Sequence, residues 1–243
     1  MAEVTCPSPF SAAGSLAALL QVEVACPDDR NPTIQTWNSS DKHADIVLSE
    51  GNLRADNTEN LQAAVRAIGS KVSGKWYWEI KVLVRGSGVS VGIGGAGAPL
   101  NNMLGFDGDA YGYIYTGKKS YGDGAHYIDY GDSYTTNDII GVALDLDTGK
   151  LWWAKNNAWQ AAGNPAAGTN EAYSGVSGTY SPMVSMLGSV DSSTKARFAA
   201  GDQSYEPPAG FESIGPTASP FIAETSLLRY RNRMSIDSSY TIP

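Results

Sequence analysis

Two glycine-rich runs in the sequence have the spacing of known catalytic or cofactor-binding loops. The run GVSVG, residues 88–92, fits the G-x-S-x-G pattern of a nucleophilic serine, which needs a strand, a sharp turn and then a helix. Ser90 instead lies within a strand-like run. The run GIGGAG, residues 92–97, fits the G-x-G-x-x-G pattern of dinucleotide sites, which need a βαβ unit. The residues that follow predict no amphipathic helix, so both runs are interpreted as structural.

Acidic side chains are the other candidates for chemistry. A glycoside hydrolase needs two carboxyl groups ~5–5.5 Å or ~6.5–9.5 Å apart across a cleft. Asp145 and Asp147 share a strand face but lie beside Gly149, where Asp commonly makes local turn hydrogen bonds. Glu79 is alone on its segment. We expect no enzyme and no catalytic residue, and a glycoside hydrolase is the least favoured alternative.

Metal ligands are sparse. The run GFDGDAYG contains Asp107 and Asp109 and is similar to a calcium loop, and calcium binding there is left open. His43 and His126 have no neighbouring ligand pattern for zinc. We therefore expect no metal and no cofactor. Cys6 and Cys26 are the only cysteines, and whether they form a disulfide is also left open.

The composition restricts the possible partners. The formal net charge of −8 repels nucleic-acid phosphates and anionic membranes, so we expect neither nucleic-acid binding nor membrane insertion. No secretory signal is recognisable at the start, and the apolar run 12–25 is too short to span a bilayer. The chain is expected to be soluble.

The elements that would position these residues are mostly strands. In GKWYWEIKV, residues 74–82, every second residue falls on the same face. One face carries Trp76, Trp78, Ile80 and Val82, which predicts that both tryptophans lie in the core. The run DIIGVALDLDTGKLWWAKNNAW, residues 138–159, predicts a hairpin with Gly149 in its turn. One helix is expected in TENLQAAVRAI, residues 58–68. This is an antiparallel all-β pattern.

These segments resemble, in order, those of the SPRY (B30.2-like) domain. The aromatic strand GKWYWEIKV, the run SVGIGGA, the segment YGYIYTGKKSYGDG, the 138–159 hairpin and the closing runs YSPMVSML and KARFAAGDQSYEPPAGF all match. Asn137 and Asn157 stand where the family often has Gly. The resemblance extends from Trp37 to Ile214.

The resemblance implies a bent antiparallel β-sandwich of concanavalin A-like architecture that binds other molecules through its loops. We expect this domain over 32–214, with an N-terminal arm over 1–31 and a C-terminal arm over 215–243. The arms would be stable only when packed on the sandwich or on another subunit.

Loops rich in Tyr, Asn, Asp and Gly are expected to form the binding surface, because this composition is typical of paratopes and of sugar sites. The candidate ligand-binding residues are Trp159, Asn157, Tyr121, Tyr127, Tyr130, Asp107 and Asp109, with Trp159 as an exposed anchor. In the C-terminal arm, alternating Arg229, Arg231 and Arg233 are expected to dock on an acidic neighbour or on the chain's own body.

A SPRY-like domain with two short arms resembles proteins encoded by bacteriophages. The expected function is thus a non-enzymatic structural module of a virion, in a tail fibre, baseplate or capsid. Its partners would be other virion proteins or further copies of itself, and its loops would contact a host protein or glycan. The alternative is a lectin-like carbohydrate-binding module.

Overall fold

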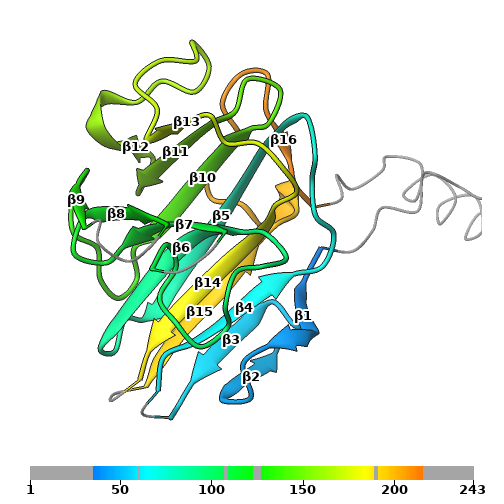
Figure 1. Cartoon of the computed structure of the whole chain (residues 1–243), viewed down its shortest axis with the longest axis vertical. Coiled ribbons are helices and arrows are strands. Elements are labelled where there is room, and N and C mark those ends of the chain that lie inside the picture. Colours follow the sequence, from blue (N-terminus) through cyan, green and yellow to red (C-terminus); the bar gives the residue numbers. More distant parts are fainter. Residues whose placement is uncertain (1–34, 60, 107–108, 123–126, 189–190, 216–243) are drawn as a thin grey trace, which may run out of the picture. The chain divides into compact units, whose positions relative to one another are not determined.

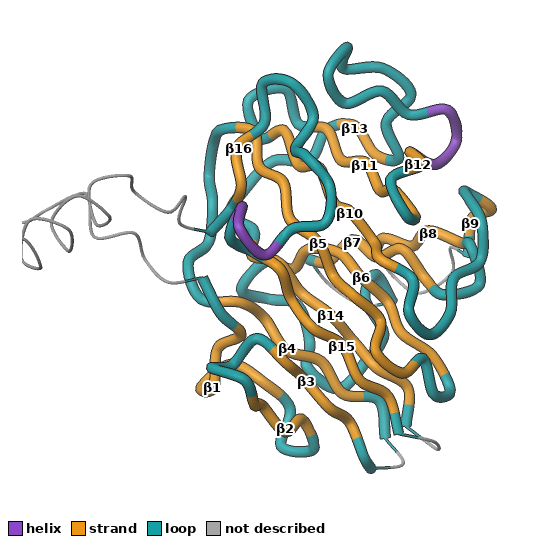
Figure 2. Tube along the Cα trace, turned by 180° about the vertical axis from the view of Figure 1, so that it is seen from behind, coloured by secondary structure: helices purple, strands orange, loops and turns teal. Residues whose placement is uncertain are grey.

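The computed structural model describes residues 35–215, except 60, 107–108, 123–126 and 189–190. Both arms, apart from Gly215, fall outside these residues, as do the cysteines. In the described part of the chain the strands form two sheets that stack as a sandwich (Figures 1 and 2). The prediction of an all-β antiparallel sandwich is confirmed. None of the helices described is long and apolar enough to cross a membrane.

One sheet has seven strands, all paired antiparallel. Their order across the sheet is β1 (Trp37–Lys42), β4 (Ala63–Ala67), β14 (Ser181–Leu187), β6 (Gly88–Gly94), β7 (Ala110–Ile114), β8 (Lys118–Tyr121) and β9 (Ile128–Asp129).

The other sheet has nine strands. Its main order is β12 (Ala158–Trp159), β11 (Lys150–Lys155), β10 (Ile139–Asp145), β5 (Lys75–Val84), β15 (Ser192–Arg197), β3 (Arg54–Asn57) and β2 (Ile46–Ser49). In addition, β13 (Tyr173–Ser174) pairs with β11, and β16 (Glu212–Ser213) pairs with β5 in parallel.

Strand β5 alternates as its sequence predicts. Trp78, Ile80 and Val82 are fully buried in the central core between the sheets, and Trp76 packs against that core while remaining partly exposed. Tyr77 faces the opposite way, into a separate cluster with Ala143, Trp152 and Phe211. The aromatic run thus contributes side chains to the buried clusters on both faces of β5.

A loop covers the outer face of the seven-stranded sheet. Leu104 packs there against Ala64, Ala110 and Met183, and the Ser120 hydroxyl donates to the Leu104 carbonyl at 2.6 Å. A Cβ on Gly112 would lie 2.7 Å from that carbonyl oxygen. The glycine therefore allows the loop to approach the sheet closely.

The expected helix over 58–68 is wrong. Residues Ala63–Ala67 form β4, which pairs with β1 on one side and β14 on the other, while Leu61 lies exposed. All five residues of β4 are buried, so sheet pairing and burial outweigh the local helical preference of the alanines. Among the described residues the helices are two 3₁₀ turns, η2 (Gln160–Ala162) and η3 (Ala200–Asp202).

The two asparagines that replace family glycines occupy left-handed backbone positions. Asn137 has φ 72° and Asn157 has φ 69°. Asn156, with φ 49°, completes with Asn157 the two-residue turn between β11 and β12, where both central residues need positive φ. Asparagine tolerates this region better than most residues, so the turns are kept.

Because Trp78 is more deeply buried than Trp76, replacing these two tryptophans should lower the free energy of unfolding by different amounts. Replacing Trp78 by Ala should lower the free energy of unfolding by about 3–5 kcal/mol, because the indole is fully buried. Trp76→Ala should lower the free energy of unfolding by clearly less, because the Trp76 ring is already partly exposed to water. Urea denaturation followed by circular dichroism measures both, and equal losses would contradict this assignment of the core.

Candidate functional site

Glu79 is a buried structural acid. Its carboxylate accepts hydrogen bonds from the Tyr77 hydroxyl at 3.1 Å and from the backbone N–H groups of Ser204 and Tyr205, both at 2.8 Å. Arg197 lies 3.6 Å away and supplies the balancing charge. The carboxylate ties the 198–211 loop onto the outer face of the nine-stranded sheet and is closed to a substrate.

Asp145 is likewise committed to local structure. It accepts hydrogen bonds from the backbone N–H of Asp147 and from the N–H and hydroxyl of Thr148, and it pairs with Lys75 at 3.0 Å. Burial raises its pKa, but the hydrogen bonds from Thr148 and Lys75 outweigh burial and leave the pKa below its usual value. A general acid of a glycoside hydrolase needs the opposite shift.

The other candidates for chemistry are also accounted for. Ser90 is fully buried within β6, as its strand-like sequence predicts. Asp109 is exposed and accepts a hydrogen bond from the Tyr180 hydroxyl at 2.7 Å, whereas Asp107 and His126 are outside the described residues. The residues that are described contain no group of three His, Cys, Asp or Glu side chains placed to hold a metal ion.

A groove of about 340 Å³ lies on the outer face of the seven-stranded sheet. We call it the apolar groove. Its lining comes from the loop before β7, the end of β7 and the turn after it, the start of β8, the segment before β9, and the end of β14. The lining residues are Met103, Ile114, Tyr115, Thr116, Lys118, Tyr127 and Leu187.

Apolar and aromatic side chains continue beyond the apolar groove. Tyr127 is 50% exposed and Ile128 is 47% exposed, although neither fills a core. Phe106 makes an edge contact with Tyr127, with ring centroids 5.0 Å apart. On the other side, Leu61 is exposed, and its carbonyl accepts from the N–H of Gly188, next to Leu187. Exposed apolar residues gathered around a depression are characteristic of a binding site.

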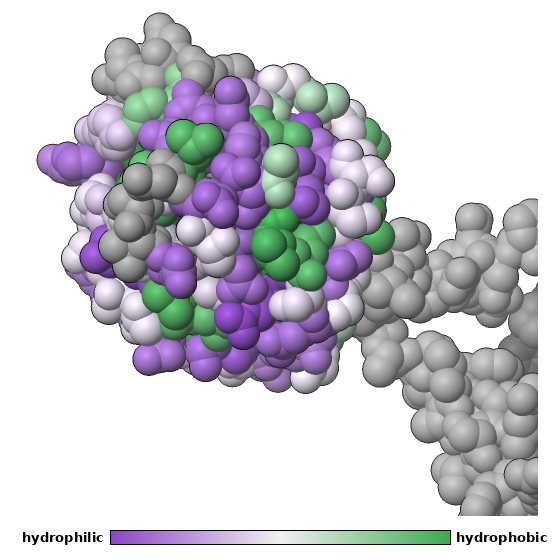
Figure 3. All heavy atoms as spheres, turned by 90° about the horizontal axis from the view of Figure 1, so that it is seen from below, coloured by the Kyte–Doolittle hydropathy of each residue, from purple (hydrophilic) through white to green (hydrophobic). Residues whose placement is uncertain are grey.

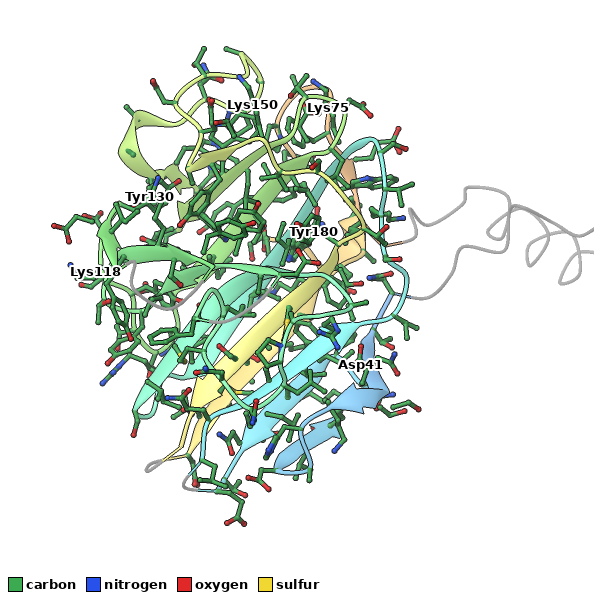
Figure 4. The ribbon with its side chains drawn as sticks, viewed as in Figure 1. Asp41, Lys75, Lys118, Tyr130, Lys150 and Tyr180 are labelled. Carbon is green, nitrogen blue, oxygen red and sulfur yellow. The ribbon has the colours of Figure 1, made fainter. Side chains whose placement is uncertain are left out.

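One face of the molecule mixes apolar and hydrophilic side chains. Figure 3, which views the molecule from below, shows apolar side chains in separate small patches among hydrophilic ones. Figure 4 labels Lys118 and Tyr130 on the side where β8 and β9 lie.

Gly88 sets one wall of the apolar groove. A Cβ at this position would lie 2.5 Å from Tyr115 Cε1 and 2.6 Å from Leu187 Cδ1. Both atoms are the outer ends of side chains, so the absence of a Cβ lets Tyr115 and Leu187 close together over β6. An alanine at Gly88 would displace the wall and leave the backbone of the sheet in place.

The rim of the apolar groove carries positive charge. Lys118 pairs with the exposed Asp129 across β8 and β9, and the Arg85 guanidinium lies 4.9 Å from the Tyr115 ring centroid. Burial, followed by the nearby Tyr115, raises the pKa of the Tyr127 hydroxyl above its ordinary value. Tyr127 thus stays a neutral hydrogen-bonding group at physiological pH.

Among the described residues predicted to bind a ligand, only Tyr127 lines this groove. Tyr121 stacks on Tyr111 with ring centroids 4.1 Å apart and is 42% exposed. Tyr130 packs against the central core, and its hydroxyl accepts from the Trp153 N–H at 3.3 Å. Asn157 forms a turn. The structure does not bring these side chains together at one place.

Trp159 differs from the exposed anchor expected from the sequence. The indole is partly buried and packs at 6.3 Å, edge to face, on Tyr77. It thus closes the outer aromatic cluster of the nine-stranded sheet. The arginines at 229, 231 and 233 lie outside the described residues, so their docking role stays a prediction.

Sequence reasoning missed Met103, Leu187 and Leu61. Each is an ordinary apolar residue at the end of a strand or in a loop, and an alternating pattern assigns such residues to the core. Leu187 ends a run, YSPMVSML, in which the residues that face outward include Ser185. Met183 also faces outward and is buried under the Leu104 loop, so the run contains no signal that marks Leu187 as a groove residue.

The comparisons with known proteins agree with the fold. The SPRY domain model matches residues 75–196. Ran-binding protein 9 of Danio rerio is 30% identical over 138 residues, which cover 53% of this chain and 23% of that protein. The Ran-binding proteins 9/10 homolog of Drosophila melanogaster is 27% identical over 138 residues, 53% of this chain and 14% of that protein.

These relatives are much longer than the matched segment, which spans less than a quarter of their length. Among solved structures, the SPRY domain of human HERC1 superimposes with a TM-score of 0.56 at 16% identity, covering 66% of this chain and 96% of that one. The likeness to that structure concerns the fold.

The buried position of Glu79 leads to a prediction about stability. Glu79→Ala should lower the free energy of unfolding by about 3 kcal/mol, because it leaves Arg197 and two backbone N–H groups without their partner. Glu206→Ala, at an exposed acid of the same loop, should change it by less than about 0.5 kcal/mol. Urea denaturation measures both. A Glu79→Ala protein with an unchanged free energy of unfolding would show that the Glu79 carboxylate does not stabilise the fold.

Proposed function

This chain belongs to the SPRY domain family, and we propose that it is a non-catalytic module that binds a segment of a partner protein in the apolar groove. The single observation that carries the proposal is the half-exposed Tyr127 beside a groove lined by Met103, Ile114 and Leu187. Met103 and Ile114 are themselves buried, whereas the Tyr127 ring stays half in water, so a partner that covered this ring would gain free energy.

The groove suits a short extended segment with one large apolar side chain. Its floor is aliphatic, through Met103, Ile114 and Leu187, and Tyr115 and Tyr127 provide rigid aromatic walls with polar tips. Such aromatic anchors commonly dominate the binding energy of protein interfaces. Thr116, Lys118 and the Tyr127 hydroxyl offer hydrogen bonds to the backbone of the segment.

A carbohydrate-binding role is the second candidate, and a different surface favours it. Tyr121 presents an exposed ring that is stacked on Tyr111, with Tyr173 at 5.1 Å and Tyr180 at 5.7 Å from the Tyr111 centroid. Asp109 lies beside this cluster through its bond to Tyr180. A sugar ring stacked on Tyr121 would find a carboxylate acceptor within the same cluster.

The virion role and self-assembly stay predictions. The relatives described above are vertebrate and insect proteins, and they lend no support to a place in a phage particle. The protein-binding role is common to both settings, because it depends on the groove and not on the source of the chain.

A peptide-display selection on the immobilised protein, followed by titration calorimetry of a selected peptide, tests the proposal. Tyr127→Ala should weaken binding by about 5–30-fold, as expected for the loss of an aromatic anchor. Gly88→Ala should also weaken it, because it displaces Tyr115 and Leu187, while the far-ultraviolet circular dichroism stays unchanged.

Tyr121→Ala is the matched control, because it removes an exposed tyrosine of similar accessibility outside the groove. It should leave peptide affinity unchanged. Peptides that bind Tyr127→Ala and Gly88→Ala as tightly as the unchanged protein would refute the groove. Loss of binding in Tyr121→Ala alone would move the site to the stacked tyrosines.

A further inference from the structure

The nine-stranded sheet carries a row of three cations on its outer face. Lys195 on β15 lies directly opposite Arg54 on β3 and directly opposite Lys81 on β5. Directly opposed residues in antiparallel strands have Cβ atoms about 4.5–5.5 Å apart. We call Arg54, Lys195 and Lys81 the cationic row. Figure 2 shows the three strands that carry it side by side.

This arrangement is unfavourable for the sheet by itself. Like charges directly opposite one another destabilise strand pairs, and here the same sign occurs on three adjacent strands of a chain whose net charge is −8. The row lines a groove of about 450 Å³ together with Arg197, the acids Glu50 and Asp202, and a floor of Leu53 and Leu83.

The charges that face the cationic row are distributed unevenly. Arg54 pairs with Asp56 at 2.9 Å and with Glu50 at 3.8 Å, and Lys195 pairs with Glu50 at 2.5 Å. Arg197 is directed to the buried Glu79. Within the described residues no ion pair or hydrogen bond is found for the Lys81 amine, which leaves the cation at the inner end of the row open.

Glu50 shows which ligand this row accepts. Its carboxylate, on the exposed turn after β2, bridges Lys195 and Arg54, and the hydrogen bond from Lys195 lowers the pKa of Glu50. The side chains of Lys195 and Arg54 are each 38% exposed. The row thus already holds one carboxylate, and the adjacent Lys81 provides the place for another.

We propose that the cationic row binds an acidic segment of a partner protein, and that Glu50 is a built-in competitor for it. Two carboxylates spaced along an extended chain would engage Lys81 and Lys195, the second by displacing Glu50. The groove floor of Leu53 and Leu83 would accept the aliphatic parts of the segment. This surface is on the other sheet from the apolar groove, so the proposal does not depend on the function proposed for that groove.

Fluorescence anisotropy with a labelled hexaglutamate peptide at low ionic strength tests this proposal. Lys81→Gln and Lys195→Gln should each weaken binding by about 2–5-fold, the range of solvent-exposed ion pairs. Glu50→Gln should strengthen binding by a similar factor, because it removes the competing carboxylate. Added salt should weaken binding, because the charges are exposed.

Controls separate the site from general charge effects. Lys150→Gln removes a cation of the same sheet that is outside the row and should leave the affinity unchanged, as should Tyr127→Ala in the apolar groove. Hexaglutamine should not bind. Lys81→Gln should melt at the same or a higher temperature than the unchanged protein, because it relieves repulsion, so its loss of affinity would not reflect unfolding.

Three results would overturn the proposal. The first is hexaglutamate binding that Lys81→Gln does not reduce. The second is a Glu50→Gln protein that binds no more tightly than the unchanged one. The third is a labelled oligothymidylate that binds the row as tightly as hexaglutamate, which would show a general anion surface instead of a site for acidic protein segments.

Discussion

The middle of strand β5, residues 77–80, is buried on both faces, and the rest of the sandwich is arranged around that constraint. Its inner face supplies Trp78, Ile80 and Val82 to the central core, and its outer face places Tyr77 and Glu79 under the 198–211 loop. A buried carboxylate is stable only when its hydrogen bonds and charge are satisfied. Glu79 therefore fixes the path of the loop that covers it, and the loop in turn supplies Phe211 to the outer cluster.

A loop covers part of the outer face of each sheet. The 198–211 loop lies on one face, and the loop that brings Leu104 onto Ala64 and Ala110 lies on the other, while Arg54 and Lys195 of the cationic row stay partly exposed. Beside the apolar groove these coverings leave the Tyr127 ring half-exposed. The binding role that we propose would therefore reside in strand ends and loops, as function commonly does when a rigid scaffold is reused for different ligands.

A structural feature of this chain can be predicted from the sequence when the interactions that determine it are local. The faces of β5 and the 138–159 hairpin follow from alternation and from turn residues, which are local properties. The helix expected over 58–68 failed because Ala63–Ala67 is determined by pairing with β1 and β14, strands that are distant in sequence. Met103, Tyr127 and Leu187 are brought together by the same kind of long-range pairing. The composition of the loops therefore predicted that Tyr127 could bind a ligand, but not which residues lie beside it.

The construction of the groove wall bears on how this family can diversify. At Gly88 the neighbours are side-chain atoms of Tyr115 and Leu187, not backbone atoms, and Tyr127 is exposed and makes an edge contact with Phe106. Substitutions at such positions alter the shape offered to a ligand with little effect on the interior that keeps the chain folded. If the groove binds as we propose, Gly88 and Tyr127 are positions where a lineage could exchange one ligand for another by single steps, whereas the buried Met103 and Ile114 also serve the fold.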